Sequence, residues 1–265
     1  MAVRPTFVSG DDRGQTELAR AIDGDADLTL VYQAIHDANS GAVWGAEALL
    51  RQRRRDGRLR EASIITEAAE ESRGPELFQL DSILVKQAYT AAAGWDGIRL
   101  HVNLSPREFQ EGNVLDRLTS LVTSCGVDTS KVHLEITETS YIEQPEETME
   151  VLMAIKKLGV GLWLDDFGTG HSSLTHLQHF PVDGIKLPGA FVRPLPDDAR
   201  CAAIVRSLMS LARELELQVI AEEVETREQL ELLRGLGCPL IQGFLFSKPM
   251  PAGEFAELTG AAARA

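Results

Sequence analysis

Two adjacent carboxylates, Asp165 and Asp166, have the residue types and the spacing that first suggest chemistry in this chain. They follow a short apolar run at residues 162–164 and precede a turn that contains Gly168 and Gly170. This pattern predicts a buried strand that ends in a tight turn, with both acids at its carboxyl end. Side chains alternate along a strand, and the glycines permit the break in the pleat that neighbouring acids need to share one site. A solvated turn explains the same residues, because Asp, Gly, Thr and Ser all favour turns.

Short apolar runs alternate with longer helical patterns from Leu28 onwards, which predicts a barrel of parallel strands and helices. Strands are predicted near residues 28–35, 42–50, 98–104, 132–137, 161–165, 184–187, 218–222 and 240–244. Helices are predicted near residues 64–71, 76–93, 114–125, 146–158, 172–179, 199–214 and 227–236, with apolar residues at helical spacing such as Ile204, Leu208, Leu211 and Leu215. The first two strands are joined by a short turn at residues 37–41, so this pair is expected to be antiparallel. The fold class is therefore α/β, a TIM-like (β/α)8 barrel with one antiparallel strand near its N-terminus.

Seven consecutive strands carry a polar side chain at or near their carboxyl ends. These residues are Glu47, Asn103, Glu135 with Glu138, Asp165 with Asp166, Lys186, Glu222 and Gln242. Chemistry in such barrels takes place at the carboxyl-end rim, so we expect these side chains to meet there. Alternatively, each acid begins a loop and points at water.

The expected cluster of acids indicates a site for two divalent cations. Glu47, Glu135, Asp165 and Asp166 would bring about four negative charges together, and such repulsion drives protonation unless cations intervene. The set offers carboxylates and the Asn103 amide without His or Cys, which favours Mg²⁺ or Mn²⁺ over zinc. Two such ions can activate water for displacement at a phosphoryl group.

Three further rim residues can assist that reaction. Lys186 could hold the water or a phosphate oxygen. Glu222 is expected to accept a proton or to orient Lys186, and Gln242 to hydrogen-bond within the rim. Ca²⁺ is expected to occupy the site yet inhibit, because its looser coordination positions the nucleophile poorly.

Composition limits the partners and the compartment. The chain has 265 residues, 44% of them hydrophobic, which suffices for one barrel-sized core, and its formal net charge of −14 disfavours binding to DNA, RNA or an anionic membrane. Three widely spaced cysteines indicate neither a disulfide framework nor a zinc site. The sequence contains neither an apolar run long enough to span a membrane nor a signal-peptide core. We therefore expect no membrane insertion and a cytoplasmic location.

Residues 1–26 carry several acids with weak periodicity, so they are expected to form a flexible tail or the remnant of a linker. Residues 27–265 are expected to form the catalytic domain. Residues 1–26 could be the trimmed end of a linker from an upstream domain in a longer protein.

Seven motifs, in order, resemble those of the EAL-domain phosphodiesterases, which cleave the bacterial messenger cyclic di-GMP to linear pGpG with Mg²⁺ or Mn²⁺. The motifs are Glu47-Ala-Leu-Leu-Arg51, Asn103-Leu-Ser105, Glu135-Ile-Thr-Glu138, Asp165-Asp-Phe-Gly-Thr-Gly170, Lys186, Ala221-Glu-Glu-Val-Glu225 and Gln242-Gly-Phe244. The resemblance runs from about residue 28 to residue 251 and implies a TIM-like barrel with one antiparallel strand.

The resemblance also implies residue roles. The implied metal ligands are Glu47, Asn103, Glu135, Asp165 and Asp166, with Lys186 and Glu222 as the water-handling pair and Gln242 as the last rim residue. Glu138 corresponds to an anchor of the loop after Asp166, and homodimerisation is a family expectation. Arg51 corresponds to a residue that contacts ligand phosphate, and Gln33 falls on the substrate wall. Leu50 could flank a guanine base or simply pack in the core.

Four neighbours depart from the family pattern. Ala34 stands in place of proline, Gln52 of tryptophan, Glu223 of glycine and Pro188 of aspartate. Glu223 would raise the pKa of Glu222 if it faced inward, but strand alternation favours the outward direction.

Other polar groups suggest less. Six arginines surround Asp56-Gly57, at residues 51, 53, 54, 55, 58 and 60, and all except Arg51 fit a solvated loop. His171, His176 and His179 lack a partner cysteine and fit loop or helix-surface positions better than zinc ligands.

Three functions remain open from the sequence. They are a two-metal phosphodiesterase, a catalytically silent receptor for cyclic di-GMP that signals through a partner, and an interaction domain with an incidental acidic rim. Turnover, binding and the effect of Glu47→Ala separate them.

Overall fold

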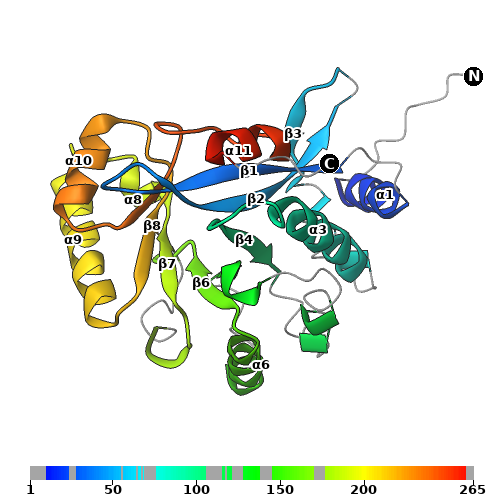
Figure 1. Ribbon diagram of the computed structural model, residues 1–265, viewed down its shortest axis with the longest axis horizontal. Coiled ribbons are helices and arrows are strands. Elements are labelled where there is room, and N and C mark those ends of the chain that lie inside the picture. Colours follow the sequence, from blue (N-terminus) through cyan, green and yellow to red (C-terminus); the bar gives the residue numbers. More distant parts are fainter. Residues whose placement is uncertain are drawn as a thin grey trace, which may run out of the picture. The chain divides into compact units, whose positions relative to one another are not determined.

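Strands and helices alternate along most of the chain in the computed structural model (Figure 1). The structure describes residues 10–23, 28–54, 56–63, 65–66, 68, 76–105, 115–116, 118–120, 128–137, 145–169 and 177–260. The chain divides into two compact units, which are described separately below. The larger contains Val31–Leu49 and Ala88–Ala265, and the smaller contains Met1–Leu30 and Leu50–Gln87.

The strands agree closely with those predicted from the alternation of apolar runs and turns. They are β1 (Leu28–Asp37), β2 (Val43–Arg53), β3 (Leu59–Glu61), β4 (Arg99–Leu104), β5 (Val132–Thr137), β6 (Gly161–Asp165), β7 (Gly184–Leu187), β8 (Gln218–Ala221) and β9 (Leu240–Gln242). Of the strands among the described residues, β3 alone was not predicted. The strands predicted over 218–222 and 240–244 end earlier than expected, at Ala221 and Gln242.

Eight of these strands close into a barrel in the larger unit. The order is β1-β9-β8-β7-β6-β5-β4-β2, and an additional β1–β2 pairing joins the two ends. β2 pairs parallel with β4, and each strand from β4 to β8 pairs parallel with the next one. By contrast, β1 pairs antiparallel with β9. The predicted TIM-like barrel with one antiparallel strand is therefore confirmed.

The turn between β1 and β2 explains the antiparallel strand. The Asp37 carboxylate accepts hydrogen bonds from the backbone N–H of Asn39 (3.1 Å) and of Ser40 (2.7 Å). Gly41 follows with a φ of 73°, a conformation that glycine adopts without steric cost. A turn this short reverses the chain directly, so no helix intervenes and the second strand must run opposite to the first.

The barrel interior has an apolar layer next to the polar residues. Ile35, Trp163, Ile220 and Leu240 form a buried cluster against which Trp44 packs. Trp163, Ile220 and Leu240 each precede a predicted site residue by two positions, and residues two apart on a strand share a face. The apolar cluster therefore lies one layer away from the rim, inside the barrel.

Seven α-helices have bounds among the described residues. They are α1 (Gly10–Ile22), α3 (Glu76–Ala92), α6 (Pro145–Lys157), α8 (Gly189–Val192), α9 (Ala199–Glu214), α10 (Arg227–Gly235) and α11 (Ala252–Thr259). In the larger unit α6 packs against β6, and α9 packs against β8 and α8. No described helix combines the length and the apolar character that crossing a membrane requires.

The predicted apolar face of the 199–214 helix was wrong by about one residue. Ile204 and Leu215 are exposed, whereas α9 buries Val205, Met209 and Ala212. Successive helical residues lie about 100° apart, so the buried stripe is rotated relative to the predicted one.

Among the α-helices that the structure describes, α1, α8 and α11 were not predicted. The helices predicted near 64–71, 114–125 and 172–179 lie largely outside the described residues, although residues 65–66, 68, 115–116, 118–120 and 177–179 are helical.

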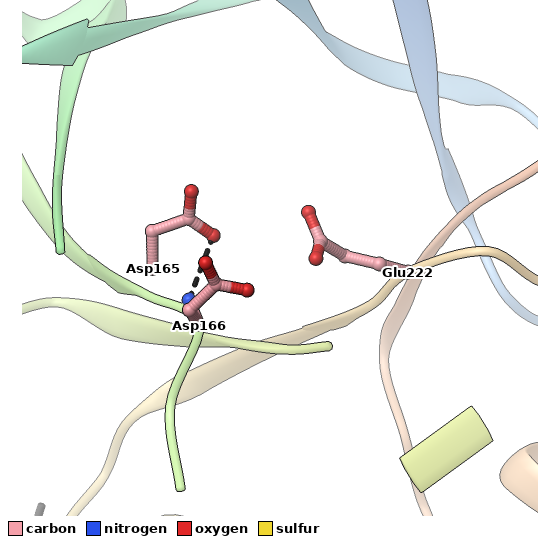
Figure 2. A group of neighbouring side chains, drawn as sticks. All are labelled: Asp165, Asp166 and Glu222. Atoms are coloured by element: carbon pink, nitrogen blue, oxygen red, sulfur yellow. Dashed lines mark hydrogen bonds between the residues drawn. The ribbon is translucent and has the colours of Figure 1, made fainter. Parts of the chain in front are cut away.

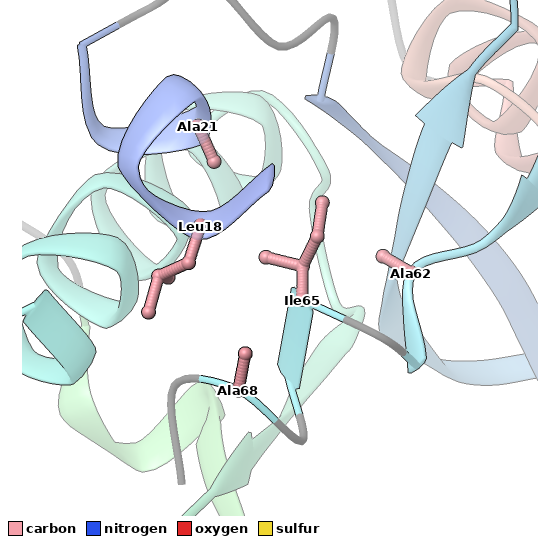
Figure 3. Packing of buried hydrophobic residues seen from close by; sticks show 5 residues of the cluster. All are labelled: Leu18, Ala21, Ala62, Ile65 and Ala68. Atoms are coloured by element: carbon pink, nitrogen blue, oxygen red, sulfur yellow. The ribbon is translucent and has the colours of Figure 1, made fainter. Parts of the chain in front are cut away.

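The smaller unit contains part of the segment expected to be a tail. Leu18 and Ala21 of α1 pack with Ala62, Ile65 and Ala68 in one buried cluster (Figure 3). Leu18 and Ala21 are the buried hydrophobic side chains among the described residues of α1, so the weak periodicity of this segment did not reveal the helix. The division of the chain at residue 26 stays a prediction.

The arginine-rich segment forms a hairpin in the smaller unit. β2 and β3 pair antiparallel with Arg51 opposite Glu61, and the turn contains Gly57 with a φ of 79°. Arg54 and Arg58 are exposed, as expected for a solvated loop. This pairing carries β2 to Arg53, so Glu47 lies in the middle of its strand and not near the end.

Candidate active site

Parallel strands bring most of the predicted site residues to one end of the barrel. Glu47 lies on β2, Asn103 on β4, Glu135 on β5, Asp165 at the end of β6, Lys186 on β7, Glu222 directly after β8 and Gln242 at the end of β9. In the register of the sheet Asn103 pairs with Glu135, which places the two side chains on one face. The strands were predicted to deliver these groups to a common rim, and their side-chain contacts show that they meet.

Lys186 is the central residue of this cluster. Its Nζ lies 2.8 Å from Oε2 of Glu135 and 2.8 Å from Oε1 of Glu222, and 3.3 Å from Oε2 of Glu47 and from Oδ1 of Asp165. Its side chain is 1% exposed. One ammonium group thus contacts carboxylates delivered by four other strands, so all five groups share a space only a few ångströms across.

Amide side chains hold Glu47 from the other side. Asn103 donates from Nδ2 to Oε1 of Glu47 at 3.0 Å, and Gln242 donates from Nε2 to Oε2 at 2.7 Å. Gln242 also donates to Oε1 of Gln33 at 3.1 Å, and Gln33 donates to the backbone carbonyl of Ser247 at 3.3 Å. Because its nitrogen faces Glu47, the Asn103 side chain has its carbonyl oxygen left as a possible cation ligand.

Asp165 and Asp166 both reach the site because the strand ends between them. Asp166 has a φ of 53°, in the left-handed region, and its N–H donates to Oδ1 of Asp165 at 2.9 Å. Asp165, Asp166 and Glu222 each offer an oxygen within 4.8 Å of the others. Figure 2 shows the carboxylates of Asp165 and Glu222 facing each other across a space that the Asp166 carboxylate borders.

Burial among like charges raises the pKa of several acids. Burial, with the charges of Asp165 and Glu47, raises the pKa of Glu222 from an ordinary value of 4.5 to about 7, although Lys186 opposes the shift. Burial and the neighbouring Glu47 charge raise the pKa of Glu135 well above its usual range. Glu222 can therefore exchange a proton near neutral pH.

The other pKa shifts follow from the same crowding. Burial and the Asp165 charge raise the pKa of Asp166. Burial disfavours the Lys186 ammonium, but the surrounding carboxylates outweigh it and hold the pKa of Lys186 well above its usual range. Burial likewise disfavours the Glu47 carboxylate, yet the Lys186 charge and the two amide hydrogen bonds lower its pKa. Glu47 and Lys186 are thus a fixed ion pair inside a group of acids.

The donor set fits hard divalent cations. Five carboxylates, those of Glu47, Glu135, Asp165, Asp166 and Glu222, surround one ammonium, so four negative charges would remain if all were ionised. Oxygen ligands without thiolates favour Mg²⁺ or Mn²⁺. The charge and the chemistry of the cluster therefore match what two such ions require.

Three predicted residues are not brought into this cluster by the described contacts. Leu50 and Arg51 belong to the smaller unit, where Leu50 packs partly against the cluster around Leu18 and Arg51 donates to the Leu50 carbonyl at 2.9 Å. Glu138 lies outside the described residues, as do His171 and His176. His179 is exposed, in keeping with a surface position.

Glu223 points away from the site, as strand alternation predicted. Its carboxylate pairs with Arg193 and lies against Gly189, and its φ of 53° accounts for a glycine preference at this position. Among the other departures, Ala34 is buried, Pro188 precedes α8, and Gln52 donates to Glu17 at 2.9 Å in the smaller unit.

Sequence reasoning missed His101, which lies 2.8 Å through Nδ1 from Oε1 of Glu135. It precedes Asn103 by two residues on β4, so the period-two pattern already placed it on the site face of the strand. That spacing was the available signal.

Comparison with known proteins agrees with the fold and identifies the family. A family model described as the EAL domain matches residues 15–249. The chain is 33% identical over 249 residues to the cyclic di-GMP phosphodiesterase NbdA of Pseudomonas aeruginosa, covering 92% of this chain and 31% of NbdA. The chain spans between 27% and 40% of the length of the curated relatives compared with it.

Two solved structures share the architecture. The PaMucR phosphodiesterase in complex with cyclic di-GMP superposes with a TM-score of 0.84 at 31% identity, covering 92% of this chain and 99% of that one. Klebsiella pneumoniae BlrP1, in a calcium and cyclic di-GMP complex, gives a TM-score of 0.73 at 29% identity, with coverages of 84% and 56%.

An eight-stranded barrel with one antiparallel strand and an acidic carboxyl-end rim defines a class of α/β barrel suited to metal-assisted chemistry. Within that class, the chain belongs to the EAL domain family, which includes cyclic di-GMP phosphodiesterases.

Proposed function

We propose that this chain hydrolyses cyclic di-GMP to linear pGpG at the barrel rim, with two Mg²⁺ or Mn²⁺ ions as cofactors. The observation that supports the proposal best is the convergence of four carboxylates on Lys186 Nζ, each within 3.3 Å. A fold can tolerate one buried ion pair, but so many like charges in one place are costly unless they serve a site.

The proposed metal ligands are the side-chain oxygens of Glu47, Asn103, Glu135, Asp165 and Asp166. The ions, when bound, would offset the negative charge of the phosphodiester and make a water molecule more acidic. Asn103 and Gln242 hold the Glu47 carboxylate by hydrogen bonds to its two oxygens, which fixes its orientation before substrate arrives.

Lys186 and Glu222 are proposed to handle the proton and the phosphate charge. The pKa of Glu222, near 7, lets its carboxylate accept a proton from the attacking water at neutral pH. The Lys186 ammonium lies 2.8 Å from Glu222 and can orient it while stabilising negative charge on a phosphate oxygen. Gln242 donates hydrogen bonds to both Glu47 and Gln33 and so holds these two side chains next to the Lys186–Glu222 pair.

Further roles are proposed from the family resemblance. Arg51 would contact ligand phosphate, Gln33 and Leu50 would line the substrate wall, and Glu138 would anchor the loop after Asp166. A homodimer and an upstream sensory or GGDEF domain are proposed on the same basis, and relatives much longer than this chain support the second.

The test is to incubate the purified protein with cyclic di-GMP and Mg²⁺ or Mn²⁺ and to follow pGpG by chromatography. We expect turnover that Glu47→Ala abolishes, whereas the control Glu231→Ala, which removes an exposed acid on α10, leaves it unchanged. Tight binding of cyclic di-GMP without turnover would instead indicate a silent receptor. If the protein neither binds nor hydrolyses cyclic di-GMP, the remaining interpretation is an interaction domain.

A further inference from the structure

A group of packed aromatic rings lies next to the acidic cluster inside the barrel. The His101 ring centroid is 4.6 Å from that of His133, 5.0 Å from that of Trp163 and 5.6 Å from that of Trp44. His101 is completely buried, and both histidines point into the barrel from adjacent parallel strands at paired positions. These rings hold the His101 imidazole in one orientation.

That orientation aims His101 at Glu135. Nδ1 of His101 lies 2.8 Å from Oε1 of Glu135, and Nζ of Lys186 lies 2.8 Å from Oε2 of the same carboxylate. The two oxygens of Glu135 are thus held from opposite sides. Its Oε2 is left on the side where Lys186, Glu47 and Asp165 meet.

Hydrogen-bond chemistry assigns opposite tautomers to the two histidines. The indole N–H of Trp163 lies 2.8 Å from Nδ1 of His133 and can only donate, so His133 accepts there and carries its hydrogen on Nε2. When Glu135 is ionised to bind a cation, its carboxylate can only accept, so His101 must carry its hydrogen on Nδ1.

We propose that His101 is a positioning residue for the metal site: its Nδ1–H fixes the Glu135 carboxylate so that Oε2 faces the acids of the rim. The inference rests on the proposed function only in taking Glu135 as a metal ligand. It extends that proposal to a residue one layer behind the ligands, on β4, that touches neither the substrate nor the ions.

The test measures Mn²⁺ affinity of the complete chain by isothermal titration calorimetry, without substrate. His101→Leu removes the donor and is expected to weaken Mn²⁺ binding by about 10–100-fold, the usual cost of losing a hydrogen-bond partner of a metal ligand. His101→Asn places an amide N–H where Nδ1 stood and is expected to restore affinity to within about threefold of the unchanged protein.

His133→Leu is the matched control. It disturbs the same group of rings and leaves the Trp163 N–H without its acceptor, but it removes no hydrogen bond to Glu135. It is expected to lower the melting temperature but to leave Mn²⁺ affinity within about threefold. Equal weakening by His133→Leu, or none by His101→Leu, would overturn the proposal. If His101→Leu does not fold, His101→Gln replaces it, since its amide reaches the Nε2 position, and affinity equal to that of His101→Asn would overturn the proposal.

The tautomers provide a second readout. In the Mg²⁺-loaded protein, nitrogen-15 NMR should find His101 protonated on Nδ1 and His133 on Nε2, and an Nε2–H tautomer of His101 would contradict the mechanism. Because neither measurement uses cyclic di-GMP, a chain that shows both effects but no hydrolysis would refute the proposed function and leave this inference standing.

Discussion

Replacing Glu222 by Gln is expected to stabilise the metal-free protein, and increasingly so as the pH rises. The folded protein raises the pKa of Glu222 from 4.5 to about 7. Between these values the folded state binds the proton that the unfolded state releases. Stability contributed by this group is therefore present at low pH and is lost as the pH rises through that window. Gln carries no ionisable group and escapes the loss.

The magnitude follows from the shift. An elevation from 4.5 to about 7 costs about 3 kcal/mol of stability at pH 8, where Glu222 is ionised in both states, and about 1 kcal/mol at pH 5. The advantage of Gln over Glu should therefore grow by about 2 kcal/mol from pH 5 to pH 8. This difference cancels effects that do not depend on pH, such as the altered hydrogen bond to Lys186.

Urea unfolding at both pH values, with a chelator present, measures this difference. Glu223→Gln is the matched control, because Glu223 is adjacent but exposed, and its effect should change by less than about 0.5 kcal/mol over the same range. An advantage of Glu222→Gln that is flat with pH, or that shrinks as the pH rises, would refute the argument that burial among like charges raises the pKa of Glu222.

Three further predictions address the charge balance, the metal and the backbone. Lys186→Met leaves buried acids without their shared counterion. It should therefore lower the free energy of unfolding in urea by about 3–5 kcal/mol and reduce pGpG formation to background. Near-native stability without added cations would contradict that charge balance. Ca²⁺ should bind, as judged by a raised melting temperature, yet slow pGpG formation at least about tenfold relative to Mn²⁺; equal rates would argue against strict positioning by the ions. Gly243→Ala places a Cβ atom onto the Val224 backbone and should lower the free energy of unfolding by at least about 1–3 kcal/mol. Gly253→Ala lies in open space on α11 and should be neutral or slightly stabilising. Equal effects of the two changes in urea unfolding would show that Gly243 does not approach the Val224 backbone closely.

The barrel could be predicted because its strands depend on a strong local signal. Buried parallel strands are short apolar runs bounded by turns, and the run before Asp165 is typical of them. The convergence of Asn103, Glu135 and Lys186 followed from topology alone, since parallel strands end at one rim. The sequence therefore carried both the fold class and the grouping of the acids.

The missed elements have weaker local signals. β3 is three residues long and its strand character arises from pairing with β2, which the arginine-rich sequence does not reveal. α1 buries only Leu18 and Ala21 among its described hydrophobic side chains, together with a partly buried Ile22. Such elements are stabilised by contacts distant in sequence, and periodicity cannot show those.

The contact between His101 and Glu135 lies beyond single-strand reasoning as well. Alternation places both side chains inside the barrel, but which atoms meet depends on the register of β4 against β5 and on the surrounding rings. The raised pKa of Glu222 has the same origin, because it depends on burial and on charges from other strands. Sequence predicted which residue types gather, and three-dimensional packing determined their protonation and orientation.

Anomalous diffraction from crystals of this protein grown with Mn²⁺ and cyclic di-GMP tests the central claim most directly. Two manganese peaks roughly 3.5–4 Å apart are expected, within bonding distance of oxygens from Glu47, Glu135 and Asp165. No manganese at the rim with the ligand bound, or manganese bound elsewhere on the chain, would contradict the account.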